Sequence, residues 1–150
     1  RHGLSFNQAT ASANNSLDAY EKGSWTPVVN FGGTASSMAA TYNNGKFTRV
    51  GDLVTLTAYI VIGTINGTGA ATLTGLPFPN GSGYGNLTSA TLPHLGNINL
   101  GSYYTLGVNA AIASSTLAFI VTSATTTAGA TNSNFSNGST IMFNFTYKAS

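Results

Sequence analysis

Leu53-Val-Thr-Leu-Thr-Ala-Tyr-Ile-Val-Ile62 is the stretch of this sequence that decides its fold. The apolar residues recur at every second position and would share one face of an extended strand: Val54, Leu56, Ala58, Ile60 and Ile62. Thr55, Thr57 and Tyr59 would share the opposite face. This alternation predicts a β-strand with one face buried in a core and the other face turned towards solvent.

The same period of two recurs in short runs along most of the chain. The last run, residues 140–147, alternates large apolar residues with polar ones, and its apolar members are Ile141, Phe143, Phe145 and Tyr147. Further strands are expected at residues 25–31, 46–50, 70–76, 87–92, 98–100, 103–108 and 115–122. Asn43-Asn-Gly45 is a hairpin-type turn signal, and Gly51-Asp52 is a second turn. The pattern predicts an all-β protein, an antiparallel β-sandwich that is jelly-roll-like.

The composition excludes several classes of protein. Charged residues make up 5% of the 150-residue chain, whereas about a quarter is usual in a soluble domain. The five basic residues are scattered and too few to neutralise a nucleic-acid backbone, so no nucleic-acid partner is expected. The most apolar run, residues 53–62, is too short to cross a bilayer, so no membrane insertion is expected. The chain has no cysteine, which excludes disulfides and thiolate metal sites.

Catalytic groups are scarce. The only acids are Asp18, Glu21 and Asp52, and none of them suggests the facing pair of carboxyls that glycoside hydrolysis requires. We expect Asp52 to sit in a turn and to pair with Arg49. The two histidines occur without a Gly-x-Ser-x-Gly motif, and no cluster of metal ligands is visible. The sequence therefore predicts a non-enzymatic chain without a cofactor or metal.

Residues 1–20 differ in composition from the rest and are expected to form a leader or stem in front of a β-sandwich module at residues 21–150. Within this junction, residues 17–22 are expected to form a helical turn. Trp25, the only tryptophan, would head the first strand of the module and cover one end of its core.

The sequence offers more candidate residues for ligand binding than for catalysis. Carbohydrate sites combine aromatic platforms with short hydrogen-bonding side chains, because sugars offer apolar faces ringed by hydroxyls. Tyr84, Tyr103 and Tyr104 are candidate platforms, although a tyrosine in such a sequence is more often a half-buried residue of the sandwich. Tyr103 and Tyr104 are adjacent on an expected strand, so one of them must face away from the core. His94 follows Pro93 in an expected loop, where it would be a surface or subunit-contact residue, and it completes the candidate set.

The edges of the expected sheets need protection from pairing with other chains, and charged residues are too few to provide it. Charged residues on edge strands normally prevent unwanted strand pairing, and this chain has few of them. We therefore expect identical copies to cover the edges in a symmetric oligomer.

Four short motifs, in this order, carry a resemblance to a known family. They are Leu17-Asp-Ala-Tyr-Glu-Lys-Gly-Ser-Trp-Thr-Pro27, Tyr42-Asn-Asn-Gly-Lys-Phe-Thr-Arg-Val-Gly-Asp-Leu-Val-Thr55, Leu73-Thr-Gly-Leu-Pro-Phe78 and the closing strand at residues 141–147. Together they resemble the β-module at the C-terminal end of bacteriophage tail-fibre, tailspike and related virion proteins. Lys22 and Phe47 depart from that pattern, in which an acid and a tyrosine are usual.

The resemblance implies a location on the virion surface, a homotrimer and a role in attachment to the host. The leading hypothesis is a non-enzymatic distal module of a tail fibre or spike that binds a host-surface glycan or outer-membrane protein. A second hypothesis is a purely structural module that trimerises and caps an upstream fibre protein or decorates a phage head. A third is that a catalytic depolymerase domain precedes the module, since the chain begins with Arg1 and could be a fragment or a processed product.

Overall fold

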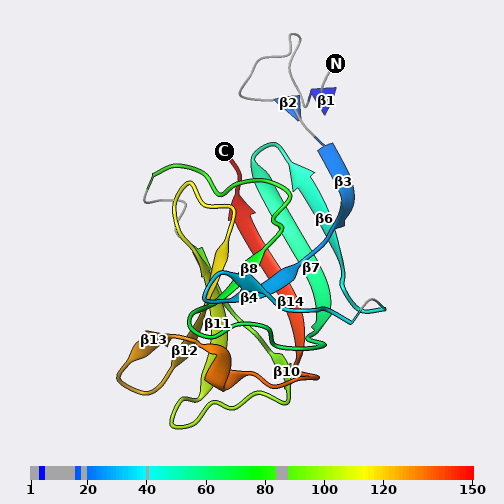
Figure 1. The fold of residues 1–150 in the computed structure, drawn as a ribbon. Coiled ribbons are helices and arrows are strands. Elements are labelled where there is room, and N and C mark those ends of the chain that lie inside the picture. The colour runs from blue at the N-terminus through cyan, green and yellow to red at the C-terminus, as the bar shows by residue number, and fades with distance from the viewer. Residues whose placement is uncertain (1–3, 6–15, 18–19, 40, 84–87) are drawn as a thin grey trace.

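The structure is a computed structural model that describes residues 4–5, 16–17, 20–39, 41–83 and 88–150. These residues form two antiparallel β-sheets that pack face to face as a sandwich (Figure 1). The described part of the chain contains no α-helix, and its one helical element is a 3₁₀ turn, Asn132–Asn134. The all-β sandwich predicted from the alternation is confirmed.

The five-stranded sheet has the order β10-β14-β7-β6-β3. Its strands are β3 (Tyr20–Trp25), β6 (Asn44–Val50), β7 (Leu53–Val61), β10 (His94–Gly96) and β14 (Thr140–Lys148). The central strand β7 has the predicted alternation, with Val54, Leu56, Ala58 and Ile60 buried. The predicted turn at Gly51 joins β6 to β7, and its φ of 62° lies in the left-handed region that favours glycine.

The seven-stranded sheet has the order β5-β4-β8-β12-β11-β9, with β13 paired to β12. Its strands are β4 (Val28–Phe31), β5 (Thr34–Ala35), β8 (Ala71–Thr74), β9 (Thr88–Thr91), β11 (Thr105–Ala110), β12 (Leu117–Thr122) and β13 (Thr127–Gly129). Two further short strands, β1 (Leu4–Ser5) and β2 (Ser16–Leu17), pair only with each other. In Figure 1 they lie beyond the end of the sandwich at which β14 ends.

The core lies between the two sheets and is rich in phenylalanine. Phe135 packs against Phe31 and Phe119, with ring centroids 5.2 and 5.3 Å apart. Phe143 and Phe145 on β14 lie 5.9 Å apart and are nearly parallel. The predicted burial of alternate residues in the last strand is confirmed, because Ile141, Phe143, Phe145 and Tyr147 are each at most 3% exposed.

Three predictions near the start of the module are wrong. Residues 20–22 belong to strand β3 and not to a helical turn, while residues 18–19 lie outside the described part. Trp25 ends β3 instead of heading the next strand, and the chain crosses to the other sheet at Thr26 and Pro27. Asn44 and Gly45 lie within β6, so the turn expected at residues 43–45 falls earlier, at residues 41–42. Burial of Trp25 in the core is confirmed.

Other differences concern local segments. Residues 98–100 are not a strand. His94, which the sequence predicts to be in a loop, begins strand β10, and β10 pairs with β14 at the edge of the five-stranded sheet. Tyr103 and Tyr104 precede β11 and are not on it. Arg49 forms no ion pair with Asp52, since its Nε donates a hydrogen bond to the Gly51 carbonyl at 2.7 Å and its guanidinium lies 4.5 Å from the centre of the Phe78 ring.

Candidate functional site

The outer face of the five-stranded sheet carries a row of side chains from four adjacent strands. Tyr59 on β7 is the register partner of Asn44 on β6 and of Met142 on β14, and Met142 in turn pairs with His94 on β10. Register partners point to the same face of a sheet, with their Cβ atoms about 5 Å apart. The four side chains therefore form one continuous line, here called the aromatic row, across the sheet.

Rings gather at this row. The ring of Tyr59 lies 5.4 Å from the ring of Tyr42 in an edge-to-face arrangement, and 6.4 Å from the ring of His94. Tyr42 and Met142 are each 49% exposed, although large apolar side chains are usually buried. A depression of about 400 Å³ lies along the row, and Asn44, Thr57, Tyr59, Pro93, Met142 and Asn144 line it. Its volume falls within the range of small-molecule sites.

The local sequence explains why these side chains meet. Tyr59 occupies an outward position of β7, because its neighbours Ala58 and Ile60 face the core. Tyr42 reaches the row from the turn before β6, where its N–H donates to the Ala39 carbonyl at 3.0 Å. Pro93 lacks an N–H and therefore suits the start of the short edge strand β10. The rigid sheet holds the row, while a turn and an edge strand complete it.

The arrangement suits a ligand with an apolar face and hydroxyl groups. The tyrosine rings offer flat apolar surfaces, and the side chains of Asn44, Thr57 and Asn144 offer hydrogen-bond donors and acceptors beside them. No side chain that lines this depression is charged.

The predicted ligand-binding residues are not brought together. His94 lies in the aromatic row, exposed at the start of β10. Tyr103 is half-buried against the core, while Tyr104 is 70% exposed, so the two do face differently even though they are not on a strand. Neither takes part in a ring contact among the described residues. Tyr84 lies outside the described residues.

Sequence reasoning missed the residues that surround His94. The signal for Tyr59 was present, since the alternation already assigns it to the solvent face of its strand. Met142 gave a similar signal, as a large apolar residue at an outward position between the buried Ile141 and Phe143. What the sequence did not show is that strands far apart in the chain place these residues in one row.

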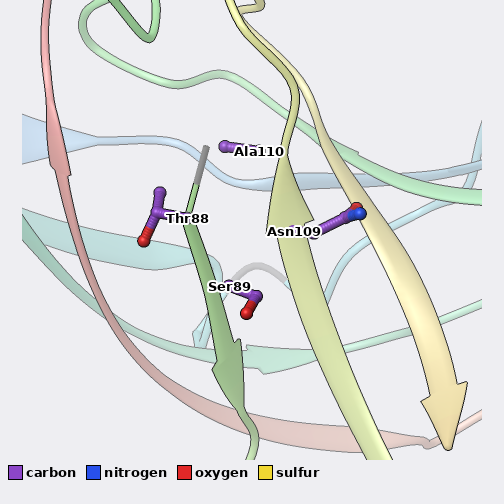
Figure 2. A pocket seen from close by; sticks show the side chains of 4 residues that line it. All are labelled: Thr88, Ser89, Asn109 and Ala110. Carbon is purple, nitrogen blue, oxygen red and sulfur yellow. The ribbon is translucent and has the colours of Figure 1, made fainter. Parts of the chain in front are cut away.

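A second depression lies between β9 and β11, on the other sheet. Figure 2 shows Thr88 and Ser89 on β9 beside Asn109 and Ala110 on β11, and these four residues line a volume of about 310 Å³. The Thr88 hydroxyl is 3.3 Å from the Thr146 carbonyl, to which it donates a hydrogen bond. The lining has short polar groups and no ring or titratable side chain, so it offers fewer means of recognition than the aromatic row.

The described residues contain no group of three or more potential metal ligands. The two described acids, Glu21 and Asp52, are both exposed and belong to β3 and to the turn after β6. No helix in the described part of the chain is long and apolar enough to cross a membrane.

One titratable group away from the aromatic row is strongly perturbed. Burial raises the pKa of Tyr147 to about 12, although the positive charge of Arg49 partly opposes this. The Tyr147 hydroxyl donates a hydrogen bond to the Phe78 carbonyl at 2.8 Å. The arrangement ties the last strand to the loop after β8, which is a structural role.

Comparison with known proteins adds no identification. The sequence matches no model of a known protein family and none of the curated proteins.

Proposed function

We propose that this chain acts by binding and not by catalysis, and that its ligand is a carbohydrate on the host surface. The observation that carries the proposal is the aromatic row together with Tyr42, whose ring packs against it, so that Tyr42, Tyr59 and His94 bring three rings together on the outer face of the sheet. A sugar ring stacked on Tyr59 would place its hydroxyls near Asn44 and Asn144. A host outer-membrane protein is the alternative ligand.

A glycan array tests the proposal directly. The protein is expected to bind a defined set of oligosaccharides, and Tyr59→Ala is expected to weaken that binding at least about tenfold, because the stacked ring supplies most of the apolar contact. Tyr104→Ala is the matched control, since Tyr104 is exposed but lies away from the row. If wild-type protein binds no glycan, or if both variants bind as wild type does, the aromatic row is not a carbohydrate site.

The biological setting follows from the sequence motifs. We propose a distal module of a bacteriophage tail fibre or spike, located on the virion surface, with an upstream fibre protein as its structural partner. The four ordered motifs and the charge-poor, cysteine-free composition support this setting. Counted over the described strands, the chain passes between the two sheets six times, from β3 to β4 onwards, which supports the jelly-roll-like description. Adsorption of host cells to the isolated protein, and competition of the protein with phage infection, would test it.

A second candidate function is trimerisation, with the module acting as a structural cap. An exposed apolar row favours it: Tyr20, Val50 and Leu53 are register partners on β3, β6 and β7 and are 58%, 38% and 46% exposed. We propose that a second copy of the chain covers this row in a homotrimer. Mass measurement in solution should give a trimer that Leu53→Lys dissociates and Tyr104→Lys leaves intact. A monomeric wild-type protein would exclude the cap.

A further inference from the structure

The outer face of the five-stranded sheet is positively charged. The three described lysines, Lys22, Lys46 and Lys148, all have outward positions on this sheet. The described acids lie elsewhere, because Glu21 alternates with the outward residues of β3 and Asp52 belongs to the turn after β6. In a chain with a net charge of +2, one sheet face thus carries three cations and no carboxylate among the described residues.

Two of these lysines are neighbours. Lys46 pairs in register with Ser24 on β3, and its Nζ donates a hydrogen bond to the Ser24 hydroxyl at 2.8 Å. Lys22 lies two residues before Ser24, on the same face, and is therefore a diagonal neighbour of Lys46. A depression of about 450 Å³ is lined by Lys22, Gly23, Ser24, Lys46, Phe47 and Thr48. We call Lys22 and Lys46 the lysine pair.

The lysine pair adjoins the aromatic row. Asn44 and Lys46 are successive outward residues of β6, so their Cα atoms are separated by about 7 Å. Thr57, which lines the aromatic depression, is the register partner of Lys46 on β7. A short oligosaccharide lying along the sheet would thus have one sugar on the tyrosine rings and the next sugar beside the ammonium groups.

We propose that the ligand of this face is an acidic oligosaccharide whose carboxylate or phosphate group binds the lysine pair. The inference rests on the proposed function and names the class of glycan. Ammonium groups form charge-assisted hydrogen bonds with both kinds of anion, and no described carboxylate on this face competes for them. The aromatic row supplies stacking for the adjacent sugar, and Thr57 and Asn144 supply partners for its hydroxyls.

Single-stranded nucleic acid also combines rings with cations, but it fits this face less well. Such binding requires a basic groove that follows the backbone over several nucleotides. Here the two neighbouring cations are on one side of Tyr59, and Met142 and Asn144 lie on its other side. The surface between them has hydroxyl and amide groups, which match sugar hydroxyls.

An array that carries uronic-acid, nonulosonic-acid, phosphorylated and neutral oligosaccharides, together with poly(dT), tests the inference. The best oligosaccharide is then titrated by calorimetry at low and at raised salt. Acidic glycans are expected to bind best, Lys46→Gln to weaken them about fivefold and the Lys22→Gln/Lys46→Gln double variant about tenfold. Lys148→Gln is the matched control, because Lys148 is on the same face but pairs with Leu53 in a distant row.

The possible results separate the acidic-glycan inference from the proposed carbohydrate-binding function. Weakening by Lys46→Gln that disappears at raised salt, with Lys148→Gln unchanged, supports the inference, and the array separates carboxylated from phosphorylated ligands. Preferred binding of neutral glycans, or unchanged affinity in the double variant, overturns the acidic class while the proposed function stands. Binding of poly(dT) above every glycan overturns it in favour of nucleic acid. Binding of no probe overturns both proposals.

Discussion

The indole of Trp25 covers Gly45, its register partner across the β3–β6 ladder, so closely that a Cβ at Gly45 would overlap the ring at Nε1. The same ladder holds a reciprocal pair two residues along, where a Cβ at Gly23 would lie 2.6 Å from Cε1 of Phe47. Trp25 also donates from Nε1 to the Thr57 carbonyl at 3.3 Å. Glycine has a low strand propensity, but at these two positions its lack of a side chain leaves space for a large ring on the neighbouring strand.

We predict that Gly45→Ala displaces the indole and destabilises the protein by about 2–4 kcal/mol, which is a large effect for one added methyl group. The backbone of Gly45 lies within β6 between two paired strands and cannot move aside. Urea unfolding followed by tryptophan fluorescence measures both the stability and the environment of Trp25.

Gly129→Ala is the control for that substitution. Gly129 also lies in a strand, its φ is not in the left-handed region, and nothing lies within 4 Å of an added Cβ. The free energy of unfolding of the Gly129→Ala variant should differ from that of wild type by less than about 0.5 kcal/mol. Equal stability of the two variants would mean that the ring is free to move and does not depend on Gly45.

The pair also explains where sequence reasoning succeeded and failed on the fold. Strong alternation predicted β7 and β14 to within a residue or two, because burial of one face is encoded locally. Asn43-Asn-Gly45 is predicted to be a turn, since that signal is also local. Position 45 requires glycine because the ring of Trp25, which is 20 positions earlier in the chain, lies against it. No local sequence pattern contains that information.

The aromatic row could also be predicted only in part, because the pairing of distant strands is not encoded locally. The alternation predicts that Tyr59 is on the solvent face, and His94 is a candidate because of its side chain alone. Their proximity depends on the register of β7, β14 and β10, which joins residues separated by more than thirty positions. The sequence also predicts a helical turn at residues 17–22, whereas Glu21 and Lys22 lie on edge strand β3, where charge discourages pairing with other chains.

That edge gives a second prediction. Glu21→Thr/Lys22→Thr leaves the net charge unchanged and raises the β-propensity of an unpaired edge, so we expect the double variant to aggregate faster than wild type. Light scattering during mild heating follows the aggregation. Lys46→Thr lowers the net charge but changes an interior strand that is paired on both sides, and it should behave as wild type does. Faster aggregation of Lys46→Thr than of the double variant would assign the effect to net charge instead.

A third prediction concerns a buried hydroxyl that connects two loops. Ser139 is fully buried; its Oγ donates to the Asn97 carbonyl at 2.7 Å and accepts from the Ser136 N–H at 2.8 Å. Ser139→Ala leaves both partners unsatisfied and should cost about 1–3 kcal/mol in urea unfolding. Ser133→Ala, at an exposed serine in the neighbouring 3₁₀ turn, should cost less than about 0.5 kcal/mol. A loss below that value for Ser139→Ala would mean that water replaces the hydroxyl.

The last prediction uses the perturbed pKa of Tyr147, which is raised from 10.0 to about 12 by burial. Between these two values the unfolded chain has lost the phenolic proton while the folded chain retains it, so stability falls as pH rises through this window. The free energy of unfolding is unaffected by this group below pH 10, and its fall is on the order of 2 kcal/mol by pH 12.

Tyr147→Phe removes the titration together with the hydrogen bond to the Phe78 carbonyl. The variant should therefore be about 1 kcal/mol less stable than wild type near neutral pH. Because the other tyrosines are common to both proteins, their effects cancel in the difference, and the variant should equal or exceed wild type near pH 12. Urea unfolding of both proteins across this range measures the difference, and a constant difference would mean that the Tyr147 hydroxyl ionises as readily in the folded chain as in the unfolded one.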